Sequence, residues 1–374
     1  MDERCVLILH KIPNHIKVKT PARICLFGDH QDYLGLPIIA CAINRFMTFD
    51  AKKNGKTFFE IAMPDIQEVR VIQLNDDFEG IGGTHDFLLA GLRVVKRYGC
   101  IPSEGFTVTI TSDIPINAGV SSSSALNVGW IHFLLKTFGC NKKITPQFIA
   151  QLAYEAEVVE HNSPGGKMDQ YTIALGNTIY LETGQKTKFQ PLGSKLKGLI
   201  LAESGIAKET IGTLKNTREL AEKAIQKVKK YDTKFEIQTA KVSDISKYVN
   251  VLDIEIRPYF EAAIKNHEIT QAALSEFQKA NSNHTYLAEL MTKHHRILKE
   301  KLQVSHPKID TMLEAAMEAG AYGGKIVGSG GGGCAVVLAS KEKEEAITQA
   351  FLKAGAKAAY PVIISNGSSV NYEA

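Results

Sequence analysis

Residues 115–125 read Pro-Ile-Asn-Ala-Gly-Val-Ser-Ser-Ser-Ser-Ala and lead directly into an apolar, helix-forming run. A glycine lets the backbone approach a ligand closely, and serines supply hydroxyl groups as well as amides. A helix that begins here points its unpaired N–H groups and its positive dipole end into the same space, which favours a phosphate group. A serine-rich N-cap of an ordinary helix is the alternative, but one serine would be enough for that role. The predicted phosphate-binding residues are Gly119, Ser121, Ser122, Ser123 and Ser124.

This segment differs from the two commonest nucleotide-binding motifs. A Walker loop requires Gly-x-x-x-x-Gly-Lys-Ser/Thr, and no lysine follows Gly119 at the required place. The Gly-x-Gly-x-x-Gly turn of dinucleotide-binding folds is absent from a strand-to-helix turn near the N-terminus. We therefore expect the phosphate to be bound by a fold of another kind.

A second segment, residues 21–35, reads Pro-Ala-Arg-Ile-Cys-Leu-Phe-Gly-Asp-His-Gln-Asp-Tyr-Leu-Gly. A strand-like run ends at Gly28, and Asp29, His30, Asp32 and Tyr33 crowd the turn beyond it. A turn needs only one aspartate for its local hydrogen bonds. Carboxylates accept hydrogen bonds from sugar hydroxyls, and a histidine ring can donate or accept. The turn is therefore either a polar hairpin loop or a site for a hydroxyl-rich ligand.

A third segment, residues 323–334, reads Gly-Gly-Lys-Ile-Val-Gly-Ser-Gly-Gly-Gly-Gly-Cys and lies between two apolar, strand-like runs. Glycines in such a place mark a backbone that another group approaches closely. A flexible linker is the alternative, but linkers rarely lie between buried strands. We therefore expect this loop to be a place where another group approaches the backbone closely.

In their order and spacing the three segments resemble the motifs of the GHMP kinases, the family of galacto-, homoserine-, mevalonate- and phosphomevalonate kinases. Residues 23–35 are most similar to the galactokinase signature, and residues 156–170 resemble the galactokinase segment that ends Met-Asp-Gln. The resemblance implies an α+β fold with an N-terminal ribosomal-protein-like α/β domain, a C-terminal ferredoxin-like domain and an active site in the cleft between them. The sequence pattern thins between residues 182 and 197. We accordingly expect domains at 1–188 and 189–374.

The resemblance also assigns roles to individual residues. Asp169 aligns with the catalytic aspartate, which accepts or orients the proton of the acceptor hydroxyl, and Arg23 aligns with the arginine beside it. The residues that align with acceptor ligands are Asp29, His30, Asp32, Gly166 and Asp169. Besides the serine-rich segment, the residues expected around ATP are Gly328, Gly330 and Gly331.

A magnesium ion is implied as well. Glu157 aligns with the metal-binding glutamate and Ser123 with the serine that shares the ion. Mg²⁺ takes few carboxylates and keeps water and phosphate oxygens as its other ligands, so one glutamate and one serine suit it. Glu155 and Glu160 are alternatives on neighbouring turns, and we prefer Glu157 for its spacing to Asp169.

Three departures from the galactokinase pattern bear on the substrate. Asp29 stands where a glutamate is usual, Lys167 replaces an isoleucine, and an expected tyrosine has no counterpart, Lys215 falling near its place. Heptose kinases of the family also have Gly-Gly-Lys before their aspartate. We predict an ATP-dependent kinase for the anomeric hydroxyl of a monosaccharide, with galactose as the best single candidate. The alternatives are kinases for a heptose, arabinose, galacturonate or mevalonate, and a non-catalytic sugar sensor.

The composition of the chain argues against several classes of ligand and site. The chain has 374 residues, 44 basic and 40 acidic side chains and a net charge of +4, an excess too small to indicate nucleic-acid binding. The basic stretch at 223–234 has helical spacing and is typical of a solvated face. Six cysteines occur singly, which disfavours a zinc site and favours a reducing cytoplasm. No apolar run reaches membrane-spanning length, and nothing indicates an obligate protein partner.

Hydrophobic periodicity predicts the elements that must position these residues. Strands are expected at 17–22, 38–50, 58–61, 68–74 and 106–111, and helices at 85–98, 123–137 and 145–160. Two short apolar segments, 171–174 and 178–180, follow a glycine-punctuated stretch. In the second half, strands are expected at 199–202, 325–327, 334–338 and 358–365, and helices at 210–230, 258–277, 286–302, 307–317 and 341–354. This second half favours an α+β sandwich with antiparallel strands.

Overall fold

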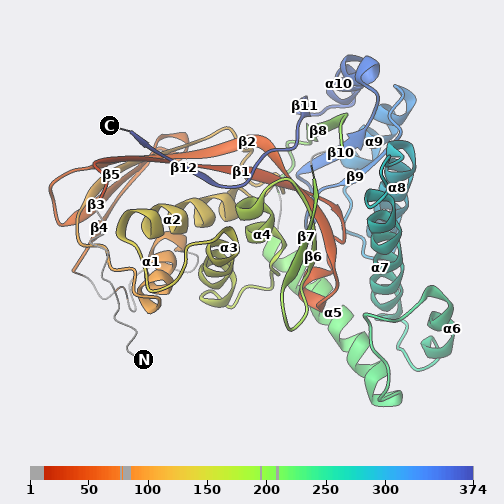
Figure 1. Ribbon diagram of the computed structural model, residues 1–374. Coiled ribbons are helices and arrows are strands. Elements are labelled where there is room, and N and C mark those ends of the chain that lie inside the picture. Colours follow the sequence, from red (N-terminus) through yellow and green to blue (C-terminus); the bar gives the residue numbers. More distant parts are fainter. Residues whose placement is uncertain (1–11, 76–77, 79–85, 194–195, 208–209, 374) are drawn as a thin grey trace.

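Two β-sheets organise the chain (Figure 1). The structure is a computed structural model that describes residues 12–75, 78, 86–193, 196–207 and 210–373. The first sheet has the order β12-β1-β2-β5-β3-β4, and β6 pairs with both β2 and β7. Among these strands only β3 and β5 pair in parallel. Their bounds are β1 (His15–Phe27), β2 (Ile38–Lys53), β3 (Phe58–Met63), β4 (Glu68–Gln73), β5 (Phe106–Ser112), β6 (Thr178–Glu182), β7 (Lys188–Gly193) and β12 (Ser369–Glu373).

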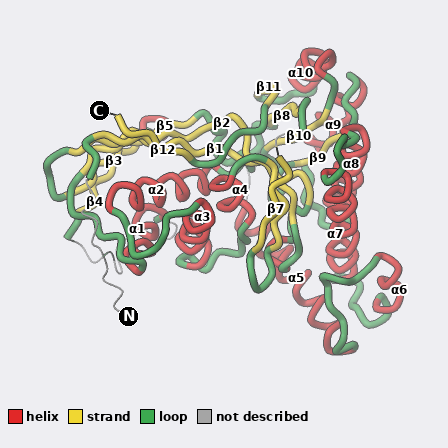
Figure 2. Tube along the Cα trace, in the orientation of Figure 1, coloured by secondary structure: helices red, strands yellow, loops and turns green. Residues whose placement is uncertain are grey.

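Helices cover one face of the first sheet, as the red tubes beneath the yellow strands show in Figure 2. They are α1 (Phe87–Arg97), α2 (Ser122–Phe138), α3 (Pro146–Tyr154) and α4 (Met168–Leu175). The central helix, α2, is apolar on most of its surface because it is buried along most of its length. Trp130 and Phe133 of α2 stack on each other, and both contact Phe59 of the sheet edge-on. Phe133 also contacts Phe106 of the sheet edge-on. This packing holds the N-terminal end of α2 at a fixed place on the sheet.

The second sheet has the order β11-β8-β10-β9, and all its strands pair antiparallel. Its strands are β8 (Leu199–Glu203), β9 (Gly323–Ile326), β10 (Cys334–Leu338) and β11 (Ala358–Val362). The helices of this half are α5 (Thr210–Tyr231), α6 (Ile245–Tyr248), α7 (Arg257–Phe277), α8 (His284–Glu300), α9 (Pro307–Glu318) and α10 (Glu344–Lys353). A separate apolar core that includes Ile200, Val337 and Phe351 lies between this sheet and its helices. The predicted two-domain α+β fold with antiparallel strands in its second half is confirmed.

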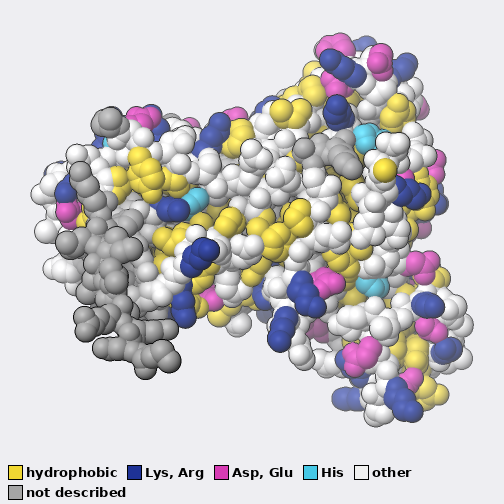
Figure 3. Space-filling view, in the orientation of Figure 1, with side chains coloured by type: hydrophobic (Ala, Val, Ile, Leu, Met, Phe, Trp, Pro, Cys, Tyr) yellow, Lys and Arg dark blue, Asp and Glu magenta, His cyan; other side chains and the backbone are white. Residues whose placement is uncertain are grey.

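The surface agrees with the interpretation of the basic stretch as a solvated face. Lys227 and Lys229 of α5 form ion pairs with Asp253 and Glu236, at 2.7 and 3.1 Å. On the face shown in Figure 3, basic and acidic side chains of the described residues lie side by side around the α5–α6 end. This face therefore presents mixed charge. Among the helices of the described residues, none combines the length and the apolar character that a membrane span requires.

Several predicted elements differ from the structure in informative ways. The helix expected at 145–160 is α3 followed by a π-helical turn, Glu155–Val159. Residues 171–174 belong to helix α4, whereas 178–180 lie in strand β6. Position 85, the expected start of the first helix, lies outside the described residues. The helix expected at 341–354 begins as a 3₁₀ turn, Lys341–Lys343.

The last strand returns to the first domain. The predicted strand at 358–365 ends at Val362, and β12 then pairs with the edge of β1. Two side chains of β1, His15 and Lys17, form ion pairs with Asp50 of β2 and Glu373 of β12 at 2.6–3.3 Å. The chain changes sheets between β7 and β8, a few residues after the expected boundary at 188. The second domain is thus enclosed between two segments of the first.

Candidate active site

A cavity of about 510 Å³ lies where the two domains meet. Its walls come from the turn after β1, the N-terminal ends of α2 and α4 and the π-helical turn on one side, and from α5 and the glycine loop on the other. The sequence-predicted residues that line it are Arg23, Asp29, His30, Asp32, Gly119, Ser121, Ser122, Ser123, Glu157, Gly166, Asp169 and Gly328. Ser124, Gly330 and Gly331 do not line it. The three predicted segments therefore meet around one space.

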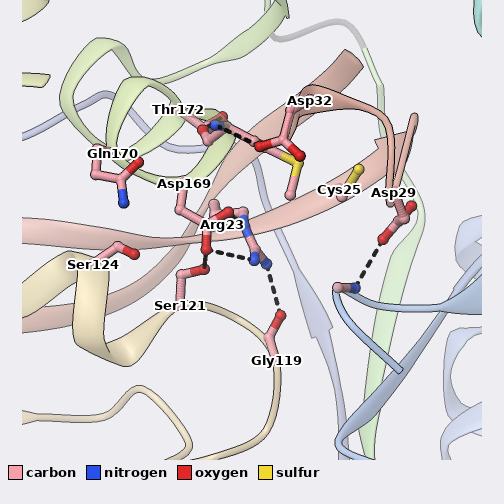
Figure 4. A network of polar contacts seen from close by, with 12 residues as sticks. Arg23, Cys25, Asp29, Asp32, Gly119, Ser121, Ser124, Asp169, Gln170 and Thr172 are labelled. Carbon is pink, nitrogen blue, oxygen red and sulfur yellow. Dashed lines mark hydrogen bonds and ion pairs between the residues drawn. The ribbon is translucent and has the colours of Figure 1, made fainter. Parts of the chain in front are cut away.

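Arg23 and Asp169 form the central ion pair of this cavity (Figure 4). Arg23 of β1 donates from Nε to Asp169 Oδ1 at 2.7 Å and from Nη2 to Oδ2 at 2.9 Å. Its third nitrogen, Nη1, donates to the carbonyl oxygen of Gly119 at 2.7 Å. The arginine is only 4% exposed, and although burial alone would lower its pKa, the charge and hydrogen bonds of Asp169 raise it. A bidentate pair of this kind fixes the carboxylate in one orientation.

The serine-rich segment forms the N-terminal end of α2, as predicted. Gly119 and Ser121 both have positive φ, at 82° and 65°, so the chain turns sharply before the helix begins. The Ser121 hydroxyl donates to Asp169 Oδ2. Ser122 and Ser123 line the cavity, whereas Ser124 is buried behind them. The positive end of the helix dipole and the first N–H groups of α2 thus face the cavity beside Asp169.

Glu157 reaches the cavity from the π-helical turn, a structure often found at functional sites. Its Oε1 accepts hydrogen bonds from the hydroxyls of Ser123 and Ser124, both at 2.9 Å, and its Oε2 accepts one from Gln170 Nε2 at 2.6 Å. Burial, followed by the charge of Asp169, raises the pKa of Glu157 to about 7. A nearby cation would stabilise the ionised form of a carboxylate in this position. One glutamate oxygen beside one serine hydroxyl fits the donor set of a Mg²⁺ ion that keeps phosphate and water ligands.

The two glutamates on neighbouring turns point elsewhere. Glu155 accepts hydrogen bonds from the Tyr98 hydroxyl, at 3.2 and 3.1 Å, and from Gln151 Nε2 at 2.8 Å. Glu160 is paired with two arginines of α1, Arg93 and Arg97. Neither glutamate lines the cavity. The geometry thus favours Glu157 as the metal-binding candidate.

The turn after β1 places Asp32 next to Gly166. Asp32 Oδ2 accepts a hydrogen bond from the backbone nitrogen of Met168 at 3.2 Å. A Cβ atom at Gly166 would collide with the Asp32 carboxylate, so a larger residue there would displace this carboxylate. Burial, followed by the charge of Asp169, raises the pKa of Asp32 to about 6. Asp32, Gly166 and Asp169 therefore form one acidic wall.

His30 and Asp29 have partners in the protein that the sequence did not indicate. The ring nitrogens of His30 lie 3.0 Å from the Tyr33 hydroxyl and 3.0 Å from the carbonyl oxygen of Ser329. Asp29 Oδ2 lies 2.7 Å from Lys325 Nζ, and Oδ1 accepts a hydrogen bond from Gly328 N at 2.9 Å. Both side chains were predicted to hold acceptor hydroxyls. In the structure both connect the first domain to the glycine loop.

The glycine loop contributes Gly328 and Ser329 to the cavity, and its other glycines shape the turn. Gly331 donates from its backbone nitrogen to the carbonyl oxygen of Val304 at 2.7 Å. A Cβ atom at Gly330 would collide with the same carbonyl. The close approach of Val304 requires glycine at position 330, whereas at position 331 the positive φ of 75° favours glycine. Neither glycine lines the cavity, and their contact with ATP stays a prediction.

Several residues that line the cavity were not predicted from the sequence. Two lysines that the sequence comparison had placed near the site, Lys167 and Lys215, do not line it. Leu214 of α5 and an apolar group also line it; this group consists of Met47, Met63, Ile66, Phe87, Ile110, Ile116 and Leu126. Each belongs to an ordinary apolar pattern, so only the fold reveals its place. Lys167 donates to the Thr187 hydroxyl at 2.7 Å, and Lys215 is exposed on α5.

Comparisons with known proteins agree with the geometry. The family models for the N-terminal domain and the C-terminal domain of GHMP kinases match residues 86–177 and 270–357. A mevalonate kinase of Thermococcus gammatolerans is 27% identical over 91% of this chain and 94% of its own length. A galactokinase of Pyrococcus furiosus is 26% identical over 90% and 93%. The crystal structure of Lactococcus lactis galactokinase complexed with galactose has the same fold, with a TM-score of 0.84, 21% identity and 95% coverage of both chains.

The two family models match in chain order, one on each domain, and the segments with the predicted chemistry converge in the cleft between those domains. The relatives of both substrate types align over nearly the whole chain. An ion-paired aspartate stands beside a helix N-terminus suited to phosphate, an arrangement compatible with phosphoryl transfer to a hydroxyl. This chain belongs to the GHMP kinase family and is a phosphotransferase with an alcohol group as its acceptor.

Proposed function

We propose that the chain is an ATP- and Mg²⁺-dependent kinase that phosphorylates the anomeric hydroxyl of a neutral monosaccharide, with galactose as the best candidate. The observation that carries the proposal is the position of Asp169. Its carboxylate, held by Arg23 and Ser121, lies in the same cavity as the N-terminal end of α2 and the acidic wall formed by Asp32. A sugar hydroxyl on that wall would meet a carboxylate on one side and a transferable phosphate on the other.

In the proposed reaction, Asp169 orients the acceptor hydroxyl and accepts its proton as the oxygen attacks the terminal phosphorus of ATP. The bond from this phosphorus to the bridging oxygen breaks, and ADP leaves. Arg23 keeps the carboxylate in place, and its charge offsets the negative charge of the transferring group. The N–H groups at the start of α2 hold the phosphates. Ser123 and Glu157 would hold Mg²⁺, and this ion would supply positive charge that offsets the charge of the phosphates.

The same cavity has an apolar wall that would suit a nucleoside. The apolar side chains on its wall come from β2, β3, β5, α1 and α2, and include Met47, Met63, Phe87 and Leu126. A flat purine base buries mainly apolar surface, at about 25 cal/mol per Å². We propose that the adenine lies against this group, with its triphosphate directed toward Gly119.

Charge favours a neutral acceptor. Among the described residues that line the cavity, Arg23 is the only lysine or arginine, and it is already paired with Asp169. The acidic residues on the same walls are Asp29, Asp32, Asp65, Glu157 and Asp169. A carboxylate-bearing acceptor such as mevalonate or galacturonate would enter this site without a cation to pair with, which is costly in a partly dry cavity. Sugar hydroxyls, by contrast, donate well to carboxylates.

Mevalonate is the second candidate, because several of the similar curated proteins are mevalonate kinases of archaea, at 25–29% identity. A heptose and arabinose remain within the neutral class. A non-catalytic sugar sensor is disfavoured by the intact pairing of Asp169 with Arg23 and of Glu157 with Ser123. We also propose a reducing compartment, the cytoplasm, because Cys25, Cys41, Cys100, Cys140 and Cys334 are free thiols and most of them are buried.

The test is ADP release from ATP and Mg²⁺ across galactose, arabinose, a heptose, galacturonate and mevalonate, with the position of the phosphate in the product determined by NMR. The proposal expects the highest kcat/KM with a neutral sugar and phosphate on the anomeric oxygen. The matched control is the Asp169→Asn variant, which has nearly the same size. Preferred turnover of mevalonate would replace the proposal with its second candidate.

A further inference from the structure

Lys325 is a buried lysine for which the proposed reaction gives no role. It lies on β9 of the second sheet and is 0% exposed. Its Nζ lies 2.7 Å from Asp29 Oδ2 and donates to the carbonyl oxygens of Ile326 and Cys25 at 2.6 and 3.1 Å. The ammonium thus forms one ion pair and two hydrogen bonds in a fully buried place. Because Asp29 and Cys25 belong to the first domain, one side chain joins the two domains.

Asp29 is the partner that receives this charge. It is 1% exposed, and burial alone would raise its pKa, but the charge of Lys325 lowers it. The residue is therefore a buried carboxylate whose charge is balanced by Lys325. Removal of either charge alone would leave the other buried and unpaired, which is strongly unfavourable.

The second oxygen of Asp29 holds the glycine loop. Asp29 Oδ1 accepts a hydrogen bond from Gly328 N at 2.9 Å. Figure 4 shows Asp29 apart from the Arg23–Asp169 pair. The next residue of the loop, Ser329, has its carbonyl oxygen 3.0 Å from His30 Nε2. Gly328 and Ser329 are the two loop residues that line the cavity. The turn after β1 therefore holds the cavity-lining part of the loop at two consecutive positions.

We propose that Lys325 is a positioning residue: it holds Asp29 against the backbone nitrogen of Gly328 and so fixes the Gly328–Ser329 wall relative to Asp169. Asp29 then acts through the loop and does not bind the acceptor. The shorter side chain of aspartate, where galactokinases usually carry glutamate, suits this role, because the carboxylate stays close to the backbone and reaches Lys325 and Gly328 together. The inference rests on the proposed function for its kinetic readout only.

The experiment uses the double variant Asp29→Leu/Lys325→Met. It replaces the buried ion pair with apolar side chains of similar size, a change that proteins often tolerate, whereas Lys325→Met alone leaves a buried carboxylate. The control is Lys215→Met, which removes an exposed lysine of α5 outside the cavity. Hydrogen–deuterium exchange is measured for segments 326–333 and 119–124, together with kcat, KM and direct binding of the best acceptor.

The proposal expects faster exchange at 326–333 in the double variant, unchanged exchange at 119–124, and a loss in kcat of about 10²-fold, the size expected when a catalytic group is misplaced by about 1 Å. The dissociation constant of the acceptor stays as in the wild type. Weaker acceptor binding with a normal kcat would overturn it by making Asp29 a ligand. Normal kinetics in a folded but less stable variant would also overturn it, by reducing the pair to a structural role.

The two proposals fail separately. Absence of turnover with every acceptor in the wild-type protein would contradict the proposed function, but the exchange of 326–333 needs no acceptor and still tests Lys325. Unchanged exchange at 326–333 in the double variant would overturn the positioning role even in an enzyme that phosphorylates sugars as proposed.

Discussion

Arg23 and Asp169, 146 positions apart in the chain, face each other through two parallel hydrogen bonds of 2.7 and 2.9 Å. The same guanidinium binds the carbonyl oxygen of Gly119. One side chain of β1 thus fixes both the carboxylate at the start of α4 and the turn that leads into α2. Because a guanidinium donates in a rigid planar fork, neither partner can shift without losing a bond. Arg23 therefore fixes the position of Asp169, in the acceptor part of the cavity, relative to the turn at Gly119, in the phosphate part.

Asp169→Asn tests the catalytic carboxylate. Asparagine keeps the size of the side chain but cannot accept a proton as a base, so we expect kcat to fall by about 10²–10⁴-fold. The KM for ATP should change little, since the N–H groups of α2 remain in place. Steady-state kinetics with the best acceptor measure the effect, and a thermal melt shows that the variant is folded. A kcat close to that of the wild type would show that Asp169 is not the catalytic base.

Glu157→Gln tests the magnesium site. The amide lacks the charge of the carboxylate beside Ser123, so the Mg²⁺ concentration for half-maximal activity should rise by about tenfold or more. The matched control is Glu155→Gln, two residues earlier, whose carboxylate contacts Tyr98 and Gln151 instead. Direct titration with Mn²⁺, followed by electron paramagnetic resonance, provides a second readout. Equal Mg²⁺ requirements in the two variants would contradict the assignment.

Acceptor binding should depend on the ionisation of Asp32, whose pKa is raised to about 6 by burial and by Asp169. Above pH 6 the carboxylate is ionised and accepts hydrogen bonds from the sugar. As the pH falls through 6 it takes up a proton, and binding should weaken. Calorimetry without nucleotide, between pH 8 and pH 5, measures this change. In Asp32→Asn we expect weaker binding with this pH dependence lost; an identical pH profile in both proteins would exclude Asp32 as its source.

The buried ring of His294 predicts acid sensitivity of the fold. It stacks on Phe27, and burial, followed by the charge of Lys325, lowers its pKa to about 3. Between pH 6.5 and 3 the unfolded chain binds a proton at this residue and the folded chain does not, so stability falls as the pH falls. At pH 5 the loss is about 2 kcal/mol.

The variant His294→Phe should remove this contribution. Both ring nitrogens of His294 lack a hydrogen-bond partner among the described residues, so a phenyl ring of similar shape need not destabilise the protein at pH 7.5. We expect the difference in Tm between pH 7.5 and pH 5 to be smaller in the variant. An unchanged difference would show that other groups cause the acid sensitivity.

The parts of the site that the sequence could predict are those whose composition is unusual over a few residues. Four consecutive serines before an apolar run, and a glycine-rich loop between apolar strands, indicate phosphate and close approach without knowledge of the fold. The roles of Arg23, Glu157 and Asp169 came from family resemblance, because a single charged residue carries no local signal. The structure brings these three into one cavity.

Other features depend on contacts that no local pattern contains. Lys325 stands in an apolar strand, and only the packing of two domains shows that its charge is met by Asp29. The π-helical turn at Glu155–Val159 continues a helical sequence pattern, so its change of hydrogen bonding was not predictable. Strand β12 is short and mostly exposed, and its conformation comes from pairing with β1.

The return of β12 to β1 also has a consequence for biosynthesis. During translation β1 and β2 leave the ribosome first, but the outer edge of β1 finds its partner only when residues 369–373 have been made. His15 and Lys17 of β1 likewise lack their partner Glu373 until this residue has been synthesised. The nascent first domain therefore exposes an open strand edge while the entire second domain is synthesised. Such an edge is a site where two growing chains can associate wrongly.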